Sequence, residues 1–312
     1  MARPLHVLLG SLVVPKPDDF VPSHDLTHVR HDPAHCSAPG LFRSFKRGDR
    51  KRLKLDVVYQ YNGGERIEFK GPEPLGADDL RVLQGLIAMG GPRGLVLGPE
   101  PKTEEGRQLR QLLEPRWGAI QDDALVVKSS FRALAKAVGY ELDSGGVMDT
   151  IKRSIERLWA VSIIVEQKGR RMGFRLLSAY ASENDSENEN RAGGLHVALN
   201  PRISGAILGR RTQHIRIELD EVRQIKGDVA CIIHQRLCAW INPGKSRRVA
   251  VETLAGYAWP EPAEGSSARM RHKRIREALE ELRAVRWNTH EYARGKFEIA
   301  RPVVGRTQLR TS

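Results

Sequence analysis

Cysteine, aromatic residues and long apolar runs are scarce in this sequence of 312 residues, and each scarcity excludes a class of protein. Three cysteines cannot form a disulfide framework, so we expect the chain to work in a reducing compartment, the cytoplasm. Aromatic residues make up only 6% of the chain, which disfavours a nucleic-acid site built on stacked bases. The apolar run at residues 5–14 is too short to cross a membrane, and no small-residue cleavage site follows it as in a signal peptide.

Sequence motifs of catalysis are absent too. Residues 242–246 end in Gly-Lys-Ser like a phosphate-binding loop, but Ala239 stands where that loop requires a glycine. The sequence holds neither a GxSxG motif nor an HExxH motif. Nothing here favours an enzyme, and we expect no catalytic residue and no cofactor.

Potential metal ligands lie in two places. The group near the N-terminus consists of His24, His28, His31, His35 and Cys36. Imidazole and thiolate bind metals, but no second ligand pair accompanies this group, so an extended polar arm is the simpler interpretation. The other candidates, Cys231 and Cys238, share one face of a helix expected from Asp220 to Ile241, where they are more simply small core residues. We therefore predict no metal site.

Positive charge is in excess. The chain carries 51 Lys and Arg residues against 38 Asp and Glu residues, a formal net charge of +13. This excess favours a polyanionic partner such as DNA, although a basic enzyme could have the same composition. The position of the charges is therefore more informative than their number.

Residues 266–302 combine a helix with a basic hairpin. Ile275, Leu279 and Leu282 recur at helical spacing, and Ser266 or Ser267 is a suitable N-cap. Two short alternating segments follow, around a turn at Arg294-Gly295. A helix followed directly by a hairpin is the second half of a winged helix, in which the helix enters a DNA groove and the hairpin contacts the backbone.

The cations of this stretch crowd its first turns and its hairpin. The candidate DNA-binding residues are Arg269, Lys273, Arg274 and Arg276 on the helix and Arg294 and Lys296 on the hairpin. Acidic residues come only in the later turns of the helix. In helix-turn-helix proteins the N-terminal half of the recognition helix contacts bases, so the distribution favours DNA binding. The alternative is a solvated helix of mixed charge.

The same order of elements occurs earlier in the chain. Ser129 or Ser130 caps a first helix, and a second helix carries Val147, Ile151, Ile155 and Leu158 on its inner face. Two strands expected at 162–169 and 173–180 form the hairpin. The candidate DNA-binding residues are Arg153 and Arg157, which face outward from the second helix, Lys152, which flanks them, and Lys168, Arg170 and Arg171 at the hairpin tip.

The two regions align with each other. Residues 131–138 match 251–258, and Leu158 then matches Leu282 and Gly173 matches Gly295 at a nearly constant separation. This predicts an internal duplication of one unit. The expected fold is α+β, with two tandem winged-helix domains. Before the first unit, alternating residues around Asn62-Gly63-Gly64 predict a β-hairpin.

We divide the chain on this basis. Residues 1–50, rich in proline, form an irregular N-terminal arm, and residues 51–182 form the first winged-helix domain. Residues 183–194 are an acidic linker, residues 195–304 the second winged-helix domain, and residues 305–312 a tail.

Long stretches of the sequence resemble the replication protein C family, the replication initiators of broad-host-range IncQ plasmids. The stretches that carry the resemblance include residues 28–42, 71–86, 131–139, 155–164, 173–182, 234–245 and 274–302. The resemblance implies binding of double-stranded origin DNA at short direct repeats (iterons), opening of adjacent AT-rich DNA, and recruitment of a plasmid helicase and primase. The first twenty-odd residues, the acidic insert and the loop at Arg210-Arg211 depart from the family pattern.

Two other classes of function use similar surfaces. A winged-helix transcription repressor or autoregulator would bind the same DNA without melting an origin. A nuclease or relaxase would cut supercoiled DNA with a divalent metal. Pairing of the first unit's hairpins could also form a homodimer.

Overall fold

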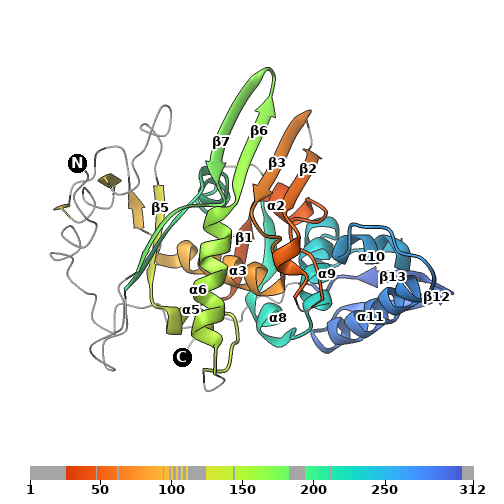
Figure 1. The fold of residues 1–312 in the computed structure, drawn as a ribbon. Coiled ribbons are helices and arrows are strands. Elements are labelled where there is room, and N and C mark those ends of the chain that lie inside the picture. Colours follow the sequence, from red (N-terminus) through yellow and green to blue (C-terminus); the bar gives the residue numbers. More distant parts are fainter. Residues whose placement is uncertain are drawn as a thin grey trace.

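The structure, a computed structural model, describes residues 26–303 except for 47, 62, 94, 98–99, 101–102, 105–106, 108–109, 112–123, 143–144, 183–193 and 211–212. Helices and sheets are mixed along the chain. Two hairpins project from one side of the molecule, and a compact group of helices with a third hairpin forms one end (Figure 1). No helix of the described part of the chain is both long and apolar enough to cross a bilayer.

The first unit has the predicted order of helices and strands. Its elements are α3 (Ala77–Arg93), β5 (Ala124–Ser129), α5 (Phe131–Ala137), α6 (Val147–Ala160), β6 (Ser162–Gln167) and β7 (Arg170–Arg175). Ser130 caps α5 by accepting a hydrogen bond from the backbone N–H of Ala133. The predicted inner face of α6 is buried, with Ile151, Ile155 and Leu158 no more than 1% exposed.

The projecting hairpins belong to one sheet. β2 (Leu55–Tyr61) and β3 (Glu65–Gly71) form the predicted hairpin, and the sheet order is β2-β3-β6-β7 with antiparallel pairing throughout. Gly63 and Gly64 turn the chain with positive φ angles of 78° and 77°, which glycine adopts without strain. The two hairpins stand side by side above α6 (Figure 1).

A second sheet differs from two of the predictions made from the sequence. It has the order β4-β5-β9-β8, formed by β4 (Leu95–Leu97), β8 (Leu177–Ser182) and β9 (Leu195–Leu199) together with β5. The single strand expected at 173–180 is wrong, because the chain leaves one sheet at β7 and enters the other at β8. Ser182 pairs with Leu195, so the predicted linker between two domains joins neighbouring strands of one sheet.

From α9 onward, the second unit repeats the order of the first. After α7 (Pro201–Ile207), its elements are β10 (Ile215–Glu218), α8 (Leu219–Gln224), α9 (Asp228–Trp240), β11 (Ser246–Ala250), α10 (Val251–Ala258), α11 (Gly265–Ala284), β12 (Asn288–Ala293) and β13 (Lys296–Ala300). β11 pairs with β13 beside the hairpin, whereas β5 of the first unit pairs with β4 and β9. The two units therefore share the order of elements but differ in strand pairing.

Three local expectations differ from the structure. Gly173 lies within β7 opposite Ile164, so the turn glycine that corresponds to Gly295 is Gly169. The helix expected from 220 to 241 is divided into α8 and α9, and the carboxylate of Glu281 accepts a hydrogen bond from the backbone N–H of Gly227 at the division. α11 begins at Gly265 and not after a serine cap, because Glu264 occupies the N-cap position.

The irregular arm expected over residues 1–50 is wrong for residues 26–46. β1 (His28–His31) pairs with β10, α2 (Pro33–Ser37) packs on α9, and η3 (Arg50–Arg52) follows. Leu26, Val29 and Leu41 are at most 1% exposed. Burial lowers the pKa of His31 to about 3, so its ring is a neutral part of the core. Residues 1–25 and the tail at 305–312 lie outside the described part of the chain.

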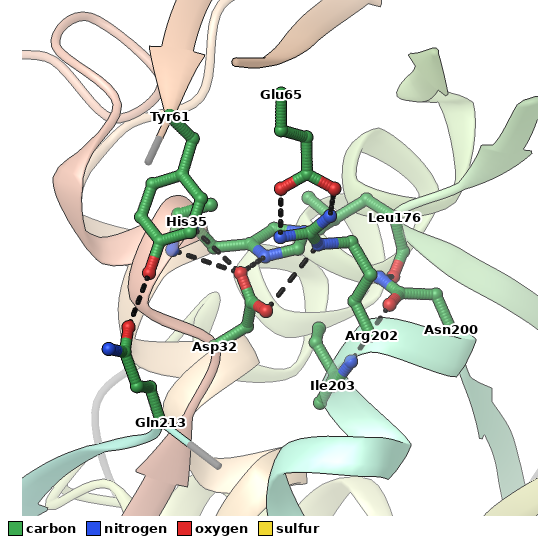
Figure 2. Close-up of polar contacts among 10 residues, drawn as sticks. Asp32, His35, Tyr61, Glu65, Leu176, Asn200, Arg202, Ile203 and Gln213 are labelled. Carbon is green, nitrogen blue, oxygen red and sulfur yellow. Dashed lines mark hydrogen bonds and ion pairs between the residues drawn. The ribbon is translucent and has the colours of Figure 1, made fainter. Parts of the chain in front are cut away.

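A buried polar cluster joins this N-terminal segment to the first unit (Figure 2). Arg202 of α7 forms two hydrogen bonds with the carboxylate of Glu65 on β3, at 2.6 and 3.1 Å. Its Nε lies 3.4 Å from Asp32, which also accepts a hydrogen bond from Nδ1 of His35 at 2.9 Å. One buried guanidinium thus neutralises two buried carboxylates from different parts of the chain.

We predict that Arg202→Met lowers the free energy of unfolding by about 3–5 kcal/mol, because both carboxylates lose their buried partner. Chemical denaturation monitored by circular dichroism measures this change. The exposed Arg153→Met variant is the matched control, and its unfolding free energy should change by no more than about 0.5 kcal/mol. Equal midpoints for the two variants would contradict the assigned role of Arg202.

Candidate nucleic-acid interface

The first turns of α11 present exposed cations. Ile275, Leu279 and Leu282 are buried, so the opposite side of the helix faces solvent. Arg269 and Lys273 are exposed there. The Nζ of Lys273 lies 3.8 Å from a carboxylate oxygen of Glu277, and both side chains are more than 60% exposed. An ion pair this exposed stabilises a helix only slightly, so Lys273 can exchange Glu277 for an external anion.

Trp259 supports a second cation of the same helix. The guanidinium of Arg274 lies 5.5 Å from the centre of the Trp259 ring, and that of Arg271 lies 5.6 Å from it. Trp259 is 8% exposed and ends α10, so it fixes the two arginines at the junction of α10 and α11. Arg274 itself remains exposed to solvent.

Arg276 is held within the protein. Its Nη2 donates to Oε1 of Glu291 on β12 at 2.9 Å, and its Nε donates to Oε2 at 3.2 Å. Glu291 also accepts a hydrogen bond from the backbone N–H of Gly295 at 2.7 Å. These bonds from Arg276 and Gly295 lower the pKa of Glu291 to about 2. The bidentate pair therefore ties the turn of the hairpin to α11.

The hairpin β12–β13 adds further cations. Arg294 and Lys296 are exposed at its turn, as predicted from the sequence. Tyr292 is 42% exposed, and the guanidinium of Arg248 on β11 lies 5.0 Å from the centre of its ring. Arg248 also lies 3.6 Å from Glu298. The exposed face of this sheet thus combines cations with one accessible aromatic ring.

Arg157 in the first unit does not face outward as predicted. Its Nη2 lies 2.7 Å from Asp79 on α3, and Arg50 lies 3.2 Å from the other oxygen of that carboxylate. Asp79 is fully buried, so Arg157 and Arg50 neutralise it. Lys152 and Arg153 are exposed on α6, and Lys152 lies over the ring of Phe131. The free cations of α6 are therefore fewer than the sequence indicated.

The tip of β6–β7 is basic and exposed. Lys168 adopts a positive φ of 49°, and Gly169 beside it has a φ of 75°. Arg170 and Arg171 follow on β7, and Arg171 lies 3.8 Å from Glu68 of the neighbouring hairpin. This tip and the hairpin β12–β13 lie in different parts of the molecule (Figure 1). A duplex in contact with both would have to extend across the molecule.

The comparison with known proteins identifies the family. The family model of replication protein C matches residues 23–303. The chain belongs to the replication protein C family. It is therefore a replication initiator, and membership of the family implies DNA binding.

Solved structures with a similar fold are those of RctB domains. A crystal structure of selenomethionine derivatives of its domains 2 and 3 matches with a TM-score of 0.53 and 12% identity, over 86% of this chain and 97% of that chain. A second crystal structure of RctB domains 2–3 gives a TM-score of 0.51 and 11% identity, over 86% and 95% of the two chains. At these identities the likeness concerns the fold alone. A search of curated proteins found no match.

Several residues that hold or border the predicted cations could not be identified from the sequence. Glu291 and Asp79 are the partners that immobilise two of the predicted arginines, and Trp259 and Tyr292 are the rings beside others. An acid on a hairpin directly after a basic helix is a signal that could have indicated the Arg276 pair. No comparable signal indicates Asp79, because α3 and α6 are separated by more than fifty residues of sequence.

We predict that Arg276→Ala raises the pKa of Glu291 from about 2 toward the ordinary value of a glutamate. Nuclear magnetic resonance titration of the side-chain carboxyl measures it. Because folding depresses this pKa, the link stabilises the hairpin above the unfolded pKa, and the stabilisation disappears as the pH falls toward 2. Arg294→Ala, which removes an arginine at the same turn, should leave the Glu291 titration unchanged. A similar rise in both variants would refute the pairing.

Proposed function

We propose that this replication initiator acts at the origin of an IncQ-type plasmid and binds its iterons through two winged-helix units. The observation that carries the proposal is the exposed basic half of α11 beside a basic hairpin that Arg276 ties to it. The order helix, strand, helix, helix and hairpin in both units supports the winged-helix interpretation. In the second unit, the pairing of β11 with β13 supports it further.

The second unit makes the sequence-reading contacts. α11 enters a major groove, where Arg269, Lys273 and Arg274 reach guanine edges or phosphates. Arg276 acts by positioning the hairpin, since Glu291 accepts hydrogen bonds from both Nε and Nη2 of its guanidinium. Arg294 and Lys296 contact the DNA backbone.

The first unit adds backbone contacts on the next face of the duplex. Lys152 and Arg153 on α6 supply some of them, and Lys168, Arg170 and Arg171 at the hairpin tip supply the rest. Several copies bound to adjacent repeats bend the DNA and strain the AT-rich segment beside them. The protein then recruits the plasmid helicase and primase, and it carries out no chemical step itself.

The first test compares iteron DNA with scrambled DNA of equal length across a salt series. We expect a specificity ratio well above about ten that persists at moderate salt, because base contacts survive the screening of phosphate contacts. Equal affinities for the two DNAs that fall together as the salt concentration rises would show that the surface binds only the DNA backbone. This result would refute specific iteron binding.

We predict that Lys273→Ala weakens iteron binding and lowers the slope of log affinity against log salt by about 0.9 if the lost contact is a phosphate. Glu277→Ala is the matched control one turn later on α11. It breaks the same ion pair but keeps the positive charge, so binding should be unchanged or tighter. Fluorescence anisotropy with labelled duplexes measures both. Equal losses in the two variants would assign the effect to the helix and not to the charge of Lys273.

A transcription repressor with the same surfaces is the second candidate, and origin opening separates the two functions. We predict that thymines of the AT-rich segment become permanganate-reactive only when a full repeat array is bound. Single-repeat DNA is the control. Reactivity with one repeat would refute opening by accumulated bending, and no reactivity with the full array would favour the repressor.

A further inference from the structure

Three potential metal ligands meet between α8 and α9. Glu221 lies in the first turn of α8, and His234 and Cys238 lie one turn apart on α9. Their ligand atoms all lie within 4.8 Å of one another, and they form the only such group in the part of the chain that the structure describes. His234 and Cys238 are at most 3% exposed.

A single ring nitrogen faces both of the other ligands. Nε2 of His234 lies 2.6 Å from Oε2 of Glu221 and 3.5 Å from Sγ of Cys238. A protonated nitrogen can donate well to only one of the two groups, and a neutral one can accept from only one. Convergence of an imidazole, a carboxylate and a thiol on one point is the arrangement that a bound cation produces.

The geometry points to a Zn²⁺ site formed by Glu221, His234 and Cys238. We propose this site as a property of the chain that does not depend on the proposed function. Cysteine, histidine and carboxylate together are zinc ligands, and a thiolate disfavours Mg²⁺ and Ca²⁺. One thiolate and one carboxylate would neutralise the two charges of the ion, which suits a buried position.

The spacing between His234 and Cys238 is that of a tetrahedral site. Bonds of about 2.0 Å to nitrogen and about 2.3 Å to sulfur place those two ligand atoms about 3.5 Å apart. The distance between Nε2 of His234 and Sγ of Cys238 is 3.5 Å. The distance of 2.6 Å to Glu221 is that of a hydrogen bond and must open by about 0.7 Å, which a rotation of the glutamate side chain can supply.

The surroundings hold the ligands and leave one side open. The indole N–H of Trp287 donates to Oε2 of Glu221 at 3.1 Å, and Arg301 donates to the carbonyl oxygen of Cys238 at 2.8 Å. Such outer contacts orient the ligands of a metal site. Glu221 also borders a cavity of about 250 Å³. This cavity can supply a water molecule as the fourth ligand and a path for the ion.

Cobalt substitution of the full-length protein tests the proposal. The protein is stripped with a chelator, dialysed and titrated with Co²⁺ and, separately, with Zn²⁺ against a coloured competing chelator. We expect about one equivalent to bind, with the visible bands of tetrahedral cobalt and the near-ultraviolet band of a cobalt–thiolate bond. Stoichiometric binding of neither ion by the folded wild-type protein would overturn the site and leave a hydrogen-bonded cluster only.

Cysteine variants test which thiolate binds the metal ion. The double variant Cys36→Ser with Cys231→Ser retains Cys238 as its one cysteine and should keep the near-ultraviolet band. Cys231→Ser alone is the matched control, because Cys231 lies on the same helix but faces Arg81. Cys238→Ser should lose the band and weaken zinc affinity by roughly tenfold or more. If Cys238→Ser does not fold, the double variant still decides, and loss of its band would refute the assignment.

Discussion

The contact between α3 and α9 determines where the two units of the molecule stand. Each is the helix with which the shared order of elements begins in its unit, and the two pack against each other. The amide of Gln84 donates to that of Gln235 at 3.0 Å, and Arg81 donates to the carbonyl oxygen of Lys226 at 2.7 Å. Both side chains of α3 are at most 5% exposed, so these polar contacts exclude water and have few alternative partners. The two basic surfaces are thereby held at a fixed distance and angle to each other.

The arginines of the chain divide into two kinds that the net charge does not distinguish. Arg157, Arg202 and Arg276 neutralise carboxylates of the protein and hold elements together. Arg153, Arg269 and Arg294 are exposed and carry their charge to the surface. The excess of positive charge that indicated DNA is therefore a poor guide to which residues contact it. Whether an arginine is paired with a carboxylate of the protein is the better guide.

Much of the fold could be predicted because it is encoded locally. The apolar faces of α6 and α11, the cap at Ser130 and the hairpin at Gly63-Gly64 each follow from a few adjacent residues, and all agree with the structure. The predictions that failed concern contacts between different elements of the fold. The switch from β7 to β8 is decided by pairing with β9, and the inward turn of Arg157 is decided by Asp79, and neither contact is encoded by adjacent residues. The N-terminal segment failed for the same reason, since its strand has no partner until β10.

The pairing of Ser182 with Leu195 indicates where the chain can tolerate insertions and deletions. The acidic insert closes a connection between two neighbouring strands, and its ends stay a strand spacing apart whatever its length. Each doubling of such a connection costs only about 0.6 kcal/mol in closure entropy. Insertions and deletions there can accumulate among relatives without altering the pairing of β8 with β9. The same position would accept a fluorescent or affinity tag while leaving both ends of the chain free.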